Sequence, residues 1–202
     1  MQYTPPPTSG WSYYNQSSTT ATTINGSAIN FYMPKHGSAG ADNFTGYVRT
    51  APSTPYTIIA NVTYNAVDIN ATTGLILTPG LGFTDGTSAT WTNPRIFETG
   101  YSLTVLYAAN STAGSANVFS DRPATATAYP WPLTQWYMIR DDGTNVYYYI
   151  SNDSQDNGST WVRLYTETRT ANFTHSKVGL FWAAQGHCDM NCTLNSWLSL
   201  AV

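Results

Sequence analysis

Charged side chains are scarce in this chain, and their scarcity argues against several classes of protein. Asp, Glu, Lys and Arg make up 9% of the 202 residues, with 8 basic and 11 acidic side chains and a net charge of −3. A protein that neutralises phosphates needs a dense basic face, so we do not expect nucleic-acid binding. No apolar run approaches the ~18 residues of a membrane-spanning helix. The opening residues 1–14 have neither a basic start nor an apolar stretch, so we expect no signal peptide.

Cysteine is rare as well, with two in the chain, Cys188 and Cys192 in the segment HCDMNC. Their spacing allows a local disulfide, and two reduced thiols are the alternative. His187 and Asp189 would complete a set of four metal-binding side chains. Zinc sites usually combine two such short spacings, and the chain has no second pair. We therefore predict no metal site here.

The sequence lacks a long segment with the 3.6-residue apolar period of a helix and shows short alternating runs instead. In residues 136–150, two alternating runs flank Asp141-Asp142-Gly143, a turn sequence typical of a hairpin. Similar runs recur between clusters of Gly, Pro, Asn, Asp and Ser. Short strands with turn signals predict an all-β protein, a single antiparallel β-sandwich. The predicted strands are 11–16, 28–33, 45–50, 56–64, 74–79, 94–98, 101–107, 116–119, 135–140, 146–151, 161–166, 177–183 and 193–201.

Alternation also predicts which residues face the core. In 56–64, Ile58, Ala60 and Val62 share one face, and in 177–183 both faces are apolar, as in a central strand. In 193–201, the pattern predicts Leu194, Leu198 and Leu200 on one face and Trp197 on the other. Residues 1–10 contain Pro5-Pro6-Pro7, which cannot donate to a sheet, so we predict an extended arm followed by one domain over 11–202.

Motifs along nearly the whole chain resemble the concanavalin A-like lectin/glucanase modules of bacteriophage virion proteins, such as tail fibres and capsid-surface proteins. The motifs that carry the resemblance are 5–28, 51–58, 136–145, 161–164, 169–173, 177–181 and 194–197. The resemblance implies a jelly-roll sandwich displayed on the virion surface after assembly in the host cytoplasm. Segments 151–161 and 185–192 depart from the pattern. Because loops vary where function varies, they are the first places to look for a ligand.

Glycoside hydrolysis requires a pair of carboxylates, which we do not find in a suitable spacing. The glucanases of this family carry Glu-x-Asp-x-x-Glu on one strand, whereas this chain has only two glutamates, Glu98 and Glu167. We expect these glutamates, and Asp141 and Asp142 in their turn, to be solvated. The histidines have no nucleophile motif with an oxyanion signature beside them; they are His36, His175 and His187. We therefore predict no catalytic residues and no enzymatic activity.

Calcium is the common partner of the legume-type lectins of this fold, and the segment 152–158 is the candidate for it. Asp153 and Asp156 lie among amide and hydroxyl side chains there, and calcium needs six to eight oxygen ligands. Asn157 and Arg163 replace the Gly and Glu of a helix-loop site. The main prediction is an ordinary turn without a cofactor, and a weak calcium site is the alternative.

Sugar binding needs an aromatic platform flanked by planar polar groups. The candidates are Tyr129, Trp131, Trp182, Gln185, Arg140 and Asp189. Trp131 stands in the stiff segment Tyr-Pro-Trp-Pro, which suits a preformed stacking surface. For Trp131 and Trp182, packing in the sandwich core is the alternative.

Together these observations predict a non-enzymatic virion surface protein that decorates a capsid or forms part of a tail fibre and binds a host glycan. The arm 1–10 would contact other virion proteins, and a homo-oligomer is compatible with the sequence. The alternative is a secreted, extracellular carbohydrate-binding glycoprotein. Ten of the 16 asparagines begin Asn-x-Ser/Thr sequons, which favours that alternative, and the missing export signal opposes it.

Overall fold

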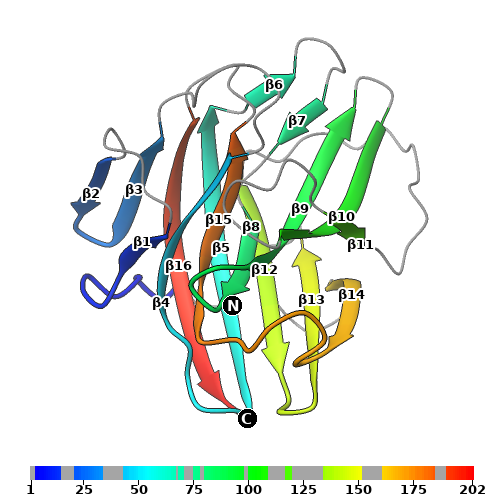
Figure 1. The fold of residues 1–202 in the computed structure, drawn as a ribbon. Coiled ribbons are helices and arrows are strands. Elements are labelled where there is room, and N and C mark those ends of the chain that lie inside the picture. The colour runs from blue at the N-terminus through cyan, green and yellow to red at the C-terminus, as the bar shows by residue number, and fades with distance from the viewer. Residues whose placement is uncertain are drawn as a thin grey trace.

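The computed structural model is an all-β sandwich of two antiparallel sheets (Figure 1). It describes residues 3–14, 21–33, 43–66, 68–70, 75–77, 80–97, 100–108, 117–119, 134–151, 161–184 and 190–202, and this part of the chain contains no helix. One sheet has nine strands, and seven of them follow the order β1-β4-β15-β8-β9-β10-β11. Of the other two, β7 pairs with β9 and β6 pairs with β7. The other sheet has seven strands in the order β14-β13-β12-β5-β16-β3-β2. The predicted fold class is confirmed.

The strands of the nine-stranded sheet are β1 Ser12–Tyr14, β4 Asn43–Thr50, β6 Asp68–Asn70, β7 Leu75–Leu77, β8 Gly80–Thr84, β9 Ala89–Phe97, β10 Gly100–Ala108, β11 Asn117–Phe119 and β15 Lys177–Ala184. Those of the seven-stranded sheet are β2 Ala21–Asn25, β3 Ala28–Met33, β5 Tyr56–Ala66, β12 Thr134–Asp141, β13 Asn145–Ser151, β14 Val162–Thr168 and β16 Met190–Ala201. Partners distant in sequence, such as β5 and β16, lie side by side, so the pairing that forms the sheets is largely long-range.

The core between the sheets is rich in aromatic rings. Tyr56, Tyr137 and Tyr148 from the seven-stranded sheet are among the largest fully buried side chains, together with Phe83 of the nine-stranded sheet. Aromatic side chains bury much apolar area and let the tyrosines keep a polar tip. This core places Ile58, Ala60 and Val62 on the inner face of β5, as their alternation predicts.

β15 is a central strand, as predicted, because it lies between β4 and β8. Its neighbours approach so closely that glycine is required. A Cβ on Gly179 would lie 2.2 Å from the carbonyl oxygen of Tyr47 and 2.6 Å from Cα of Val48. Glycine spacing therefore controls how tightly the middle of the nine-stranded sheet packs.

Three strands were not expected from the sequence: β2, β6 and β8. β8 has the sequence GLGFT, whose two glycines resemble a turn more than a strand. All five of its residues are buried, because β15 and β9 pair with it on its two sides. Tertiary burial overrides the weak local preference here.

The prediction for β16 was wrong in its second half. Leu194 and Trp197 both belong to the core, whereas Leu200 is exposed. The register of β16 against β5 shifts between Leu194 and Ser196. A bulge of this kind adds one residue to a strand and reverses the faces that follow it.

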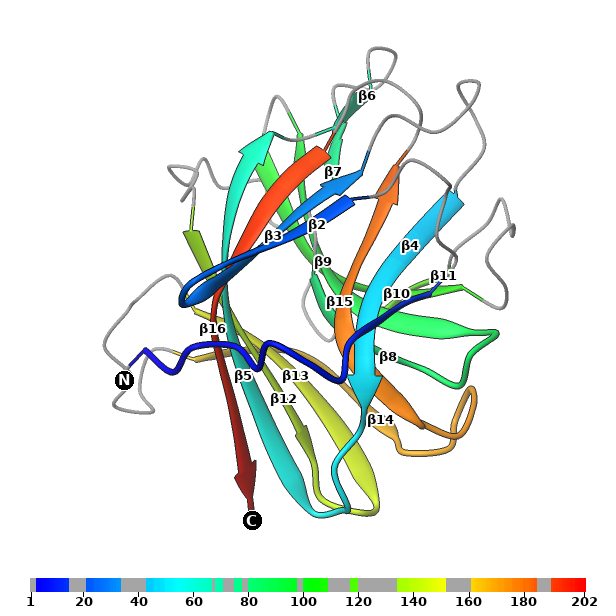
Figure 2. The ribbon, with the colours of Figure 1, turned by 90° about the vertical axis from the view of Figure 1, so that its left-hand side faces the viewer.

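Residues 3–11, which include most of the predicted arm, lie against their own sandwich. Figure 2 shows this segment crossing the strands of the seven-stranded sheet before it turns up beside β4. Pro6 is buried, and Trp11 stacks on Tyr47 at 5.1 Å between ring centroids and meets Trp197 edge-on at 4.9 Å. The arm therefore contributes an aromatic side chain to the edge of the core.

We expect Gly179→Ala to destabilise the protein by about 1–3 kcal/mol, because the new methyl group would overlap the backbone of β4. Urea denaturation followed by tryptophan fluorescence measures this change. Thr168→Ala, at an exposed position of β14, is the control and should stay within about 0.5 kcal/mol of the wild type. Equal stability of the two variants would contradict the close packing of β15 and β4.

Candidate functional site

The bulge in β16 docks the arm on the outer face of the seven-stranded sheet. Trp197 donates its backbone N–H to the carbonyl oxygen of Thr4 at 2.8 Å instead of to a neighbouring strand. The N–H of Thr4 in turn donates to the Ser196 hydroxyl at 2.9 Å. These two bonds fix the arm at Thr4 and therefore fix the position of the preceding residue, Tyr3.

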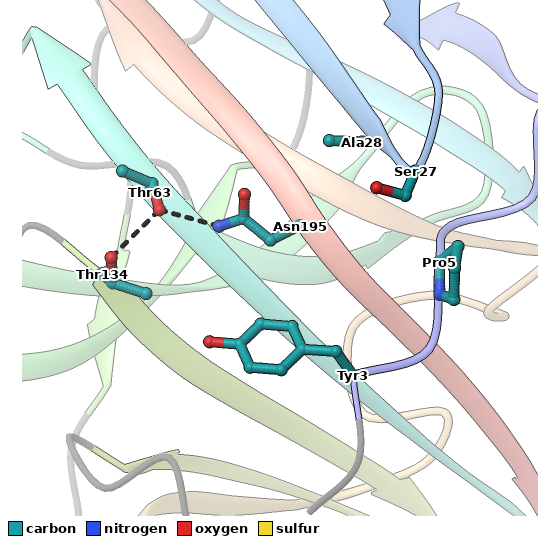
Figure 3. A pocket seen from close by; sticks show the side chains of 7 residues that line it. All are labelled: Tyr3, Pro5, Ser27, Ala28, Thr63, Thr134 and Asn195. Carbon is teal, nitrogen blue, oxygen red and sulfur yellow. Dashed lines mark hydrogen bonds between the residues drawn. The ribbon is translucent and has the colours of Figure 1, made fainter.

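Tyr3 forms one wall of an open pocket of about 550 Å³, lined by Tyr3, Pro5, Ser27, Ala28, Thr63, Thr134 and Asn195 (Figure 3). The ring of Tyr3 lies 5.3 Å from that of Trp136, at an angle of 54°, and the side chain is 52% exposed. Ser27 lies in the turn that joins β2 to β3, Ala28 is the first residue of β3, and both lie across the pocket from Thr134 in Figure 3. The pocket therefore combines residues from both ends of the chain.

The floor of the pocket is a chain of hydroxyl and amide groups. Asn195 Nδ2 donates to Thr63 Oγ1 at 2.7 Å, and the hydroxyls of Thr63 and Thr134 are 3.0 Å apart (Figure 3). The amide of Asn195 also donates to Asn61 Oδ1 at 3.0 Å, beneath the floor. These bonds orient the polar groups before any ligand arrives, which reduces the entropy that binding must overcome.

Such a pocket suits an uncharged polyol. A sugar ring offers hydroxyls for hydrogen bonds and an apolar face for an aromatic side chain, and the pocket offers both kinds of partner. None of the described residues that line the pocket is a carboxylate, histidine or cysteine. Their hydroxyl, amide and aromatic groups are suited to hydrogen bonding and stacking with a sugar ring.

The carboxylates expected to be solvated, Asp141 and Glu167, are instead buried, with exposed fractions of 0% and 6%. Glu167 accepts hydrogen bonds from Tyr148 Oη at 2.6 Å and from Asn172 Nδ2 at 2.8 Å. Burial raises its pKa, and these two bonds oppose the rise. The expectation of solvation was wrong because the alternation of β12 and β14 places both side chains on the face toward the core.

Asp141 belongs to the same end of the core. Its Oδ2 accepts a hydrogen bond from Arg169 Nε at 2.8 Å, and its Oδ1 accepts one from the N–H of Gly143 at 2.9 Å. Both bonds close loops, one at the hairpin turn and one after β14. Asp142, the neighbour that does face solvent, has a lowered pKa because the N–H groups of Asn145 and Thr144 donate to it. The hydrogen bonds from Arg169 and Gly143 to Asp141 compensate the free-energy cost of burying its carboxylate.

His175 lies beside this group of acids. Its ring stacks on Phe83 at 4.3 Å, nearly parallel, and its Nδ1 is buried without a hydrogen-bond partner. Burial lowers the pKa of His175 to about 4, while Asp141 raises it and Arg169 lowers it by smaller amounts. The side chain is therefore neutral at physiological pH and acts as part of the aromatic core.

The sequence-predicted sugar-binding residues are mostly beyond the described part of the chain. Arg140 lies exposed on the outer face of β12, and Trp182 lies on β15, opposite Thr45 of β4. Outside the described residues are Tyr129, Trp131, Gln185 and Asp189, the calcium candidates Asp153 and Asp156, and Cys188. Arg140 does not line the pocket, so the structure does not join it to the site around Tyr3.

Of the two cysteines, only Cys192 lies within the described residues. Cys192 is a buried free thiol, and burial raises its pKa to about 12. The described residues contain no group of three or more His, Cys, Asp or Glu that could hold a metal ion. Nor does the described part include a helix long and apolar enough to cross a membrane.

Sequence reasoning missed the pocket, although one signal was present. Asn195-Ser196 interrupts the apolar alternation between Leu194 and Trp197, which is typical of a bulge. Tyr3 gave no signal, because nothing local indicates that the arm folds back onto the sheet. Thr63 and Thr134 lie 71 positions apart, and only the pairing of β5 with β12 brings them together.

Comparison with known proteins supports the fold. No protein-family model and no curated protein matches the chain. A functionally unknown protein from Saccharomyces cerevisiae aligns with a TM-score of 0.63 and 12% identity over 96% of this chain and 97% of that one. The Ca²⁺-bound VIP36 exoplasmic/lumenal domain aligns with a TM-score of 0.55 and 10% identity over 96% of this chain and 84% of that one. A β-1,3-glucanase from Mycobacterium marinum aligns with a TM-score of 0.50 and 10% identity over 98% of this chain and 93% of that one.

These likenesses show a jelly-roll sandwich of the concanavalin A-like lectin/glucanase type. At 10–12% identity they show the fold alone. The comparisons contain nothing that points to phage virion proteins. The chemistry of this chain has to be argued from its own residues.

We predict that the free energy of unfolding decreases as the pH drops from about 6.5 to 4. His175 has a pKa of about 4 in the folded protein and 6.5 in the unfolded chain, so in this range the proton binds preferentially to the unfolded chain. The loss reaches about 3 kcal/mol for this group. His175→Phe keeps a ring against Phe83 and removes the titration. Urea denaturation at pH 7, 5.5 and 4 should show that the stability of the variant, relative to that of the wild type, increases as the pH falls.

Comparing the two proteins at each pH removes the contribution of Glu167, which has the opposite sign. Its raised pKa favours the folded state at low pH, and that contribution is lost as the pH rises through the folded value. Parallel stability profiles for the wild type and His175→Phe would rule out the buried, neutral histidine as a source of acid sensitivity.

Proposed function

We propose that this protein binds carbohydrate in the pocket beside Tyr3 and does not cleave it. The observation that carries the proposal is the preformed hydroxyl–amide floor of Thr63, Thr134 and Asn195 beneath an exposed aromatic ring. The sandwich type also occurs in a β-1,3-glucanase, so a sugar ligand is in keeping with the fold. The site would bind a neutral sugar ring, with Tyr3 against its apolar face.

A hydrolytic function receives less support from the acids of the chain. Glu167 is occupied by two hydrogen-bond donors in the core, and Asp141 is paired with Arg169. A retaining or inverting mechanism requires two carboxyl groups that reach the same glycosidic bond from a solvent-open site. Neither Asp141 nor Glu167 meets that requirement, so we favour recognition without turnover.

The wider setting that we propose is the surface of a bacteriophage virion, on the capsid or on a tail fibre, with the host glycan as ligand. Support comes from the resemblance of the sequence motifs and from the Pro-rich arm, whose residues 3–10 reach across one sheet. The arm would then serve two roles, as a wall of the pocket and as a contact with neighbouring virion proteins.

The secreted glycoprotein remains the second candidate, and its sequons argue against it in two places. Asn61 begins a sequon but is fully buried, with its Oδ1 accepting a bond from Asn195. Asn172 begins another, and its Nδ2 donates to Glu167. Asn61 has no room for a glycan in this fold, and a glycan on Asn172 would crowd the amide nitrogen that donates to Glu167. At least the Asn61 sequon is therefore not explained by glycosylation.

Tyr3→Ala and Thr134→Val should each weaken glycan binding by about tenfold, since a lost contact of about 1.4 kcal/mol has that effect. A glycan array, with and without added calcium, identifies the ligand, and calorimetry on the best ligand gives the affinities. Tyr3→Phe should retain binding because the ring is kept. Tyr32→Ala removes an exposed tyrosine that does not line the pocket and serves as the control.

Wild-type affinity in both Tyr3→Ala and Thr134→Val would move the binding site elsewhere on the protein. Dependence on calcium would direct attention to Asp153 and Asp156. Failure of every glycan on the array to bind would favour a structural or decorating role.

Deletion of residues 2–10 should abolish incorporation into virus particles if the arm contacts other virion proteins. Because the deletion also removes a pocket wall, Tyr3→Ala is the matched control: it keeps the Thr4 backbone bonds and should be incorporated normally. Particle composition measured by mass spectrometry distinguishes the two. Normal incorporation of the deletion variant would exclude the arm as the contact.

A further inference from the structure

Beyond the pocket, the outer face of the seven-stranded sheet carries two tyrosines between two arginines. Val146, Tyr148 and Ile150 of β13 are buried in the core, so the alternate residues Tyr147 and Tyr149 face outward. Both are half-buried at the surface of the sheet. They form a pair of aromatic side chains about 7 Å apart along one strand.

The neighbouring strands place one exposed arginine beside each tyrosine. Arg140 of β12 is directly opposite Tyr147, and its Cζ lies 5.9 Å from the centre of that ring. Arg163 of β14 is directly opposite Tyr149. Both arginines are exposed, and they lie on opposite sides of β13. Directly opposite side chains of adjacent strands start within contact distance of each other. Arg163 therefore leaves its strand beside Tyr149, just after a shift in the β13–β14 register, and the Arg140 guanidinium lies over Tyr147.

Among the described residues, Asp142 is an acidic group beside this face, and its hydrogen bonds limit its effect. Its Oδ2 accepts the hydroxyl of Tyr147 at 2.9 Å, and its Oδ1 accepts the N–H groups of Thr144 and Asn145 at 2.8 and 2.7 Å. The carboxylate therefore positions the Tyr147 ring beside Arg140. It also offsets part of the charge of Arg140.

This face lies on the same side of the seven-stranded sheet as the pocket, at the other end of β12. The outward positions of β12 run from Thr134, which lines the pocket, through Trp136 and Met138 to Arg140. At ~3.4 Å per residue, Thr134 and Arg140 are about 20 Å apart. Tyr3 packs on Trp136 and so extends the aromatic surface from the pocket toward Tyr149.

We propose that the face formed by Arg140, Tyr147, Tyr149 and Arg163 binds the carboxylate-bearing residues of an acidic polysaccharide that also occupies the pocket. The proposal rests on the function proposed above and names the class of glycan. The tyrosines contact the apolar faces of the sugar rings, and each guanidinium pairs with a carboxylate through two parallel hydrogen bonds.

A uronate-type chain fits the charge of this protein better than a heavily sulfated one. The chain has a net charge of −3 and only 8 basic side chains. A dense polyanion would be repelled by the acidic molecule beyond the two arginines, within a screening length of about 8 Å at physiological salt. Carboxylates spaced along a chain need only separate single cations, which Arg140 and Arg163 provide.

The test compares an oligomer of galacturonic acid with the same oligomer after methyl esterification, by calorimetry at low and at physiological salt. The wild type should bind the acid more tightly than the ester, with a preference that shrinks as salt increases. Arg163→Gln and Arg140→Gln should each lose about fivefold in affinity for the acid, and little for the ester. Lys177→Gln removes a cation of the other sheet and should behave as the wild type.

The outcomes separate this proposal from the function on which it rests. Equal affinity of the wild type for acid and ester, or unchanged binding in both arginine variants, overturns the acidic ligand and leaves neutral sugar binding intact. If Tyr3→Ala binds both ligands more weakly but still prefers the acid to the ester, both proposals are supported. Tighter binding of a sulfated oligosaccharide than of the uronate would contradict the assignment to carboxylates, and absence of any binding would count against both.

Discussion

The backbone hydrogen bond from Trp197 to Thr4 joins the two ends of the chain, and the candidate site depends on it. It exists because the bulge in β16 turns the N–H of Trp197 away from the ladder. The same bulge returns Trp197 to the core after Leu194 and leaves Asn195 on the outer face. One extra residue in a strand therefore anchors the arm, places Tyr3 and supplies the amide of the pocket floor.

The polar chemistry of the molecule is divided between the inside and the outside of the seven-stranded sheet. On its inner side, the described carboxylates of Asp141 and Glu167 accept hydrogen bonds that hold the β12–β13 turn and the loop after β14 in place. The outer side offers hydroxyls, amides, tyrosines and two arginines. Groups buried with saturated partners stabilise the fold, whereas groups exposed on the outer face can contact a ligand.

Local patterns predicted much of the architecture. Alternation located the inner face of β5 and the central position of β15, and Asp-Asp-Gly located the β12–β13 hairpin. These features need only a period of two and a turn residue. The same approach missed β8, because its glycines were read as turn residues, although they permit close strand packing in the middle of the nine-stranded sheet.

The candidate site was less predictable, for a physical reason. The predicted residues Tyr129 and Trp131 were chosen because an aromatic next to prolines suggests a stiff platform, and this segment lies outside the described residues. The aromatic that the structure places at a pocket, Tyr3, is distinguished by no neighbour in sequence. Its role arises from a contact with β16, 192 positions away at Thr4 and Ser196.

Composition and alternation alone were sufficient for the class of this protein: low charge, short strands and frequent turn residues lead to an antiparallel sandwich because each strand has to bury one face. Tertiary structure decided the rest. Strand order brought Thr63, Thr134 and Asn195 together, burial separated Asp141 and Glu167 from solvent, and the bulge seated the arm. Such outcomes depend on which distant strands pair, and the free energy of pairing comes from contacts that no local segment contains.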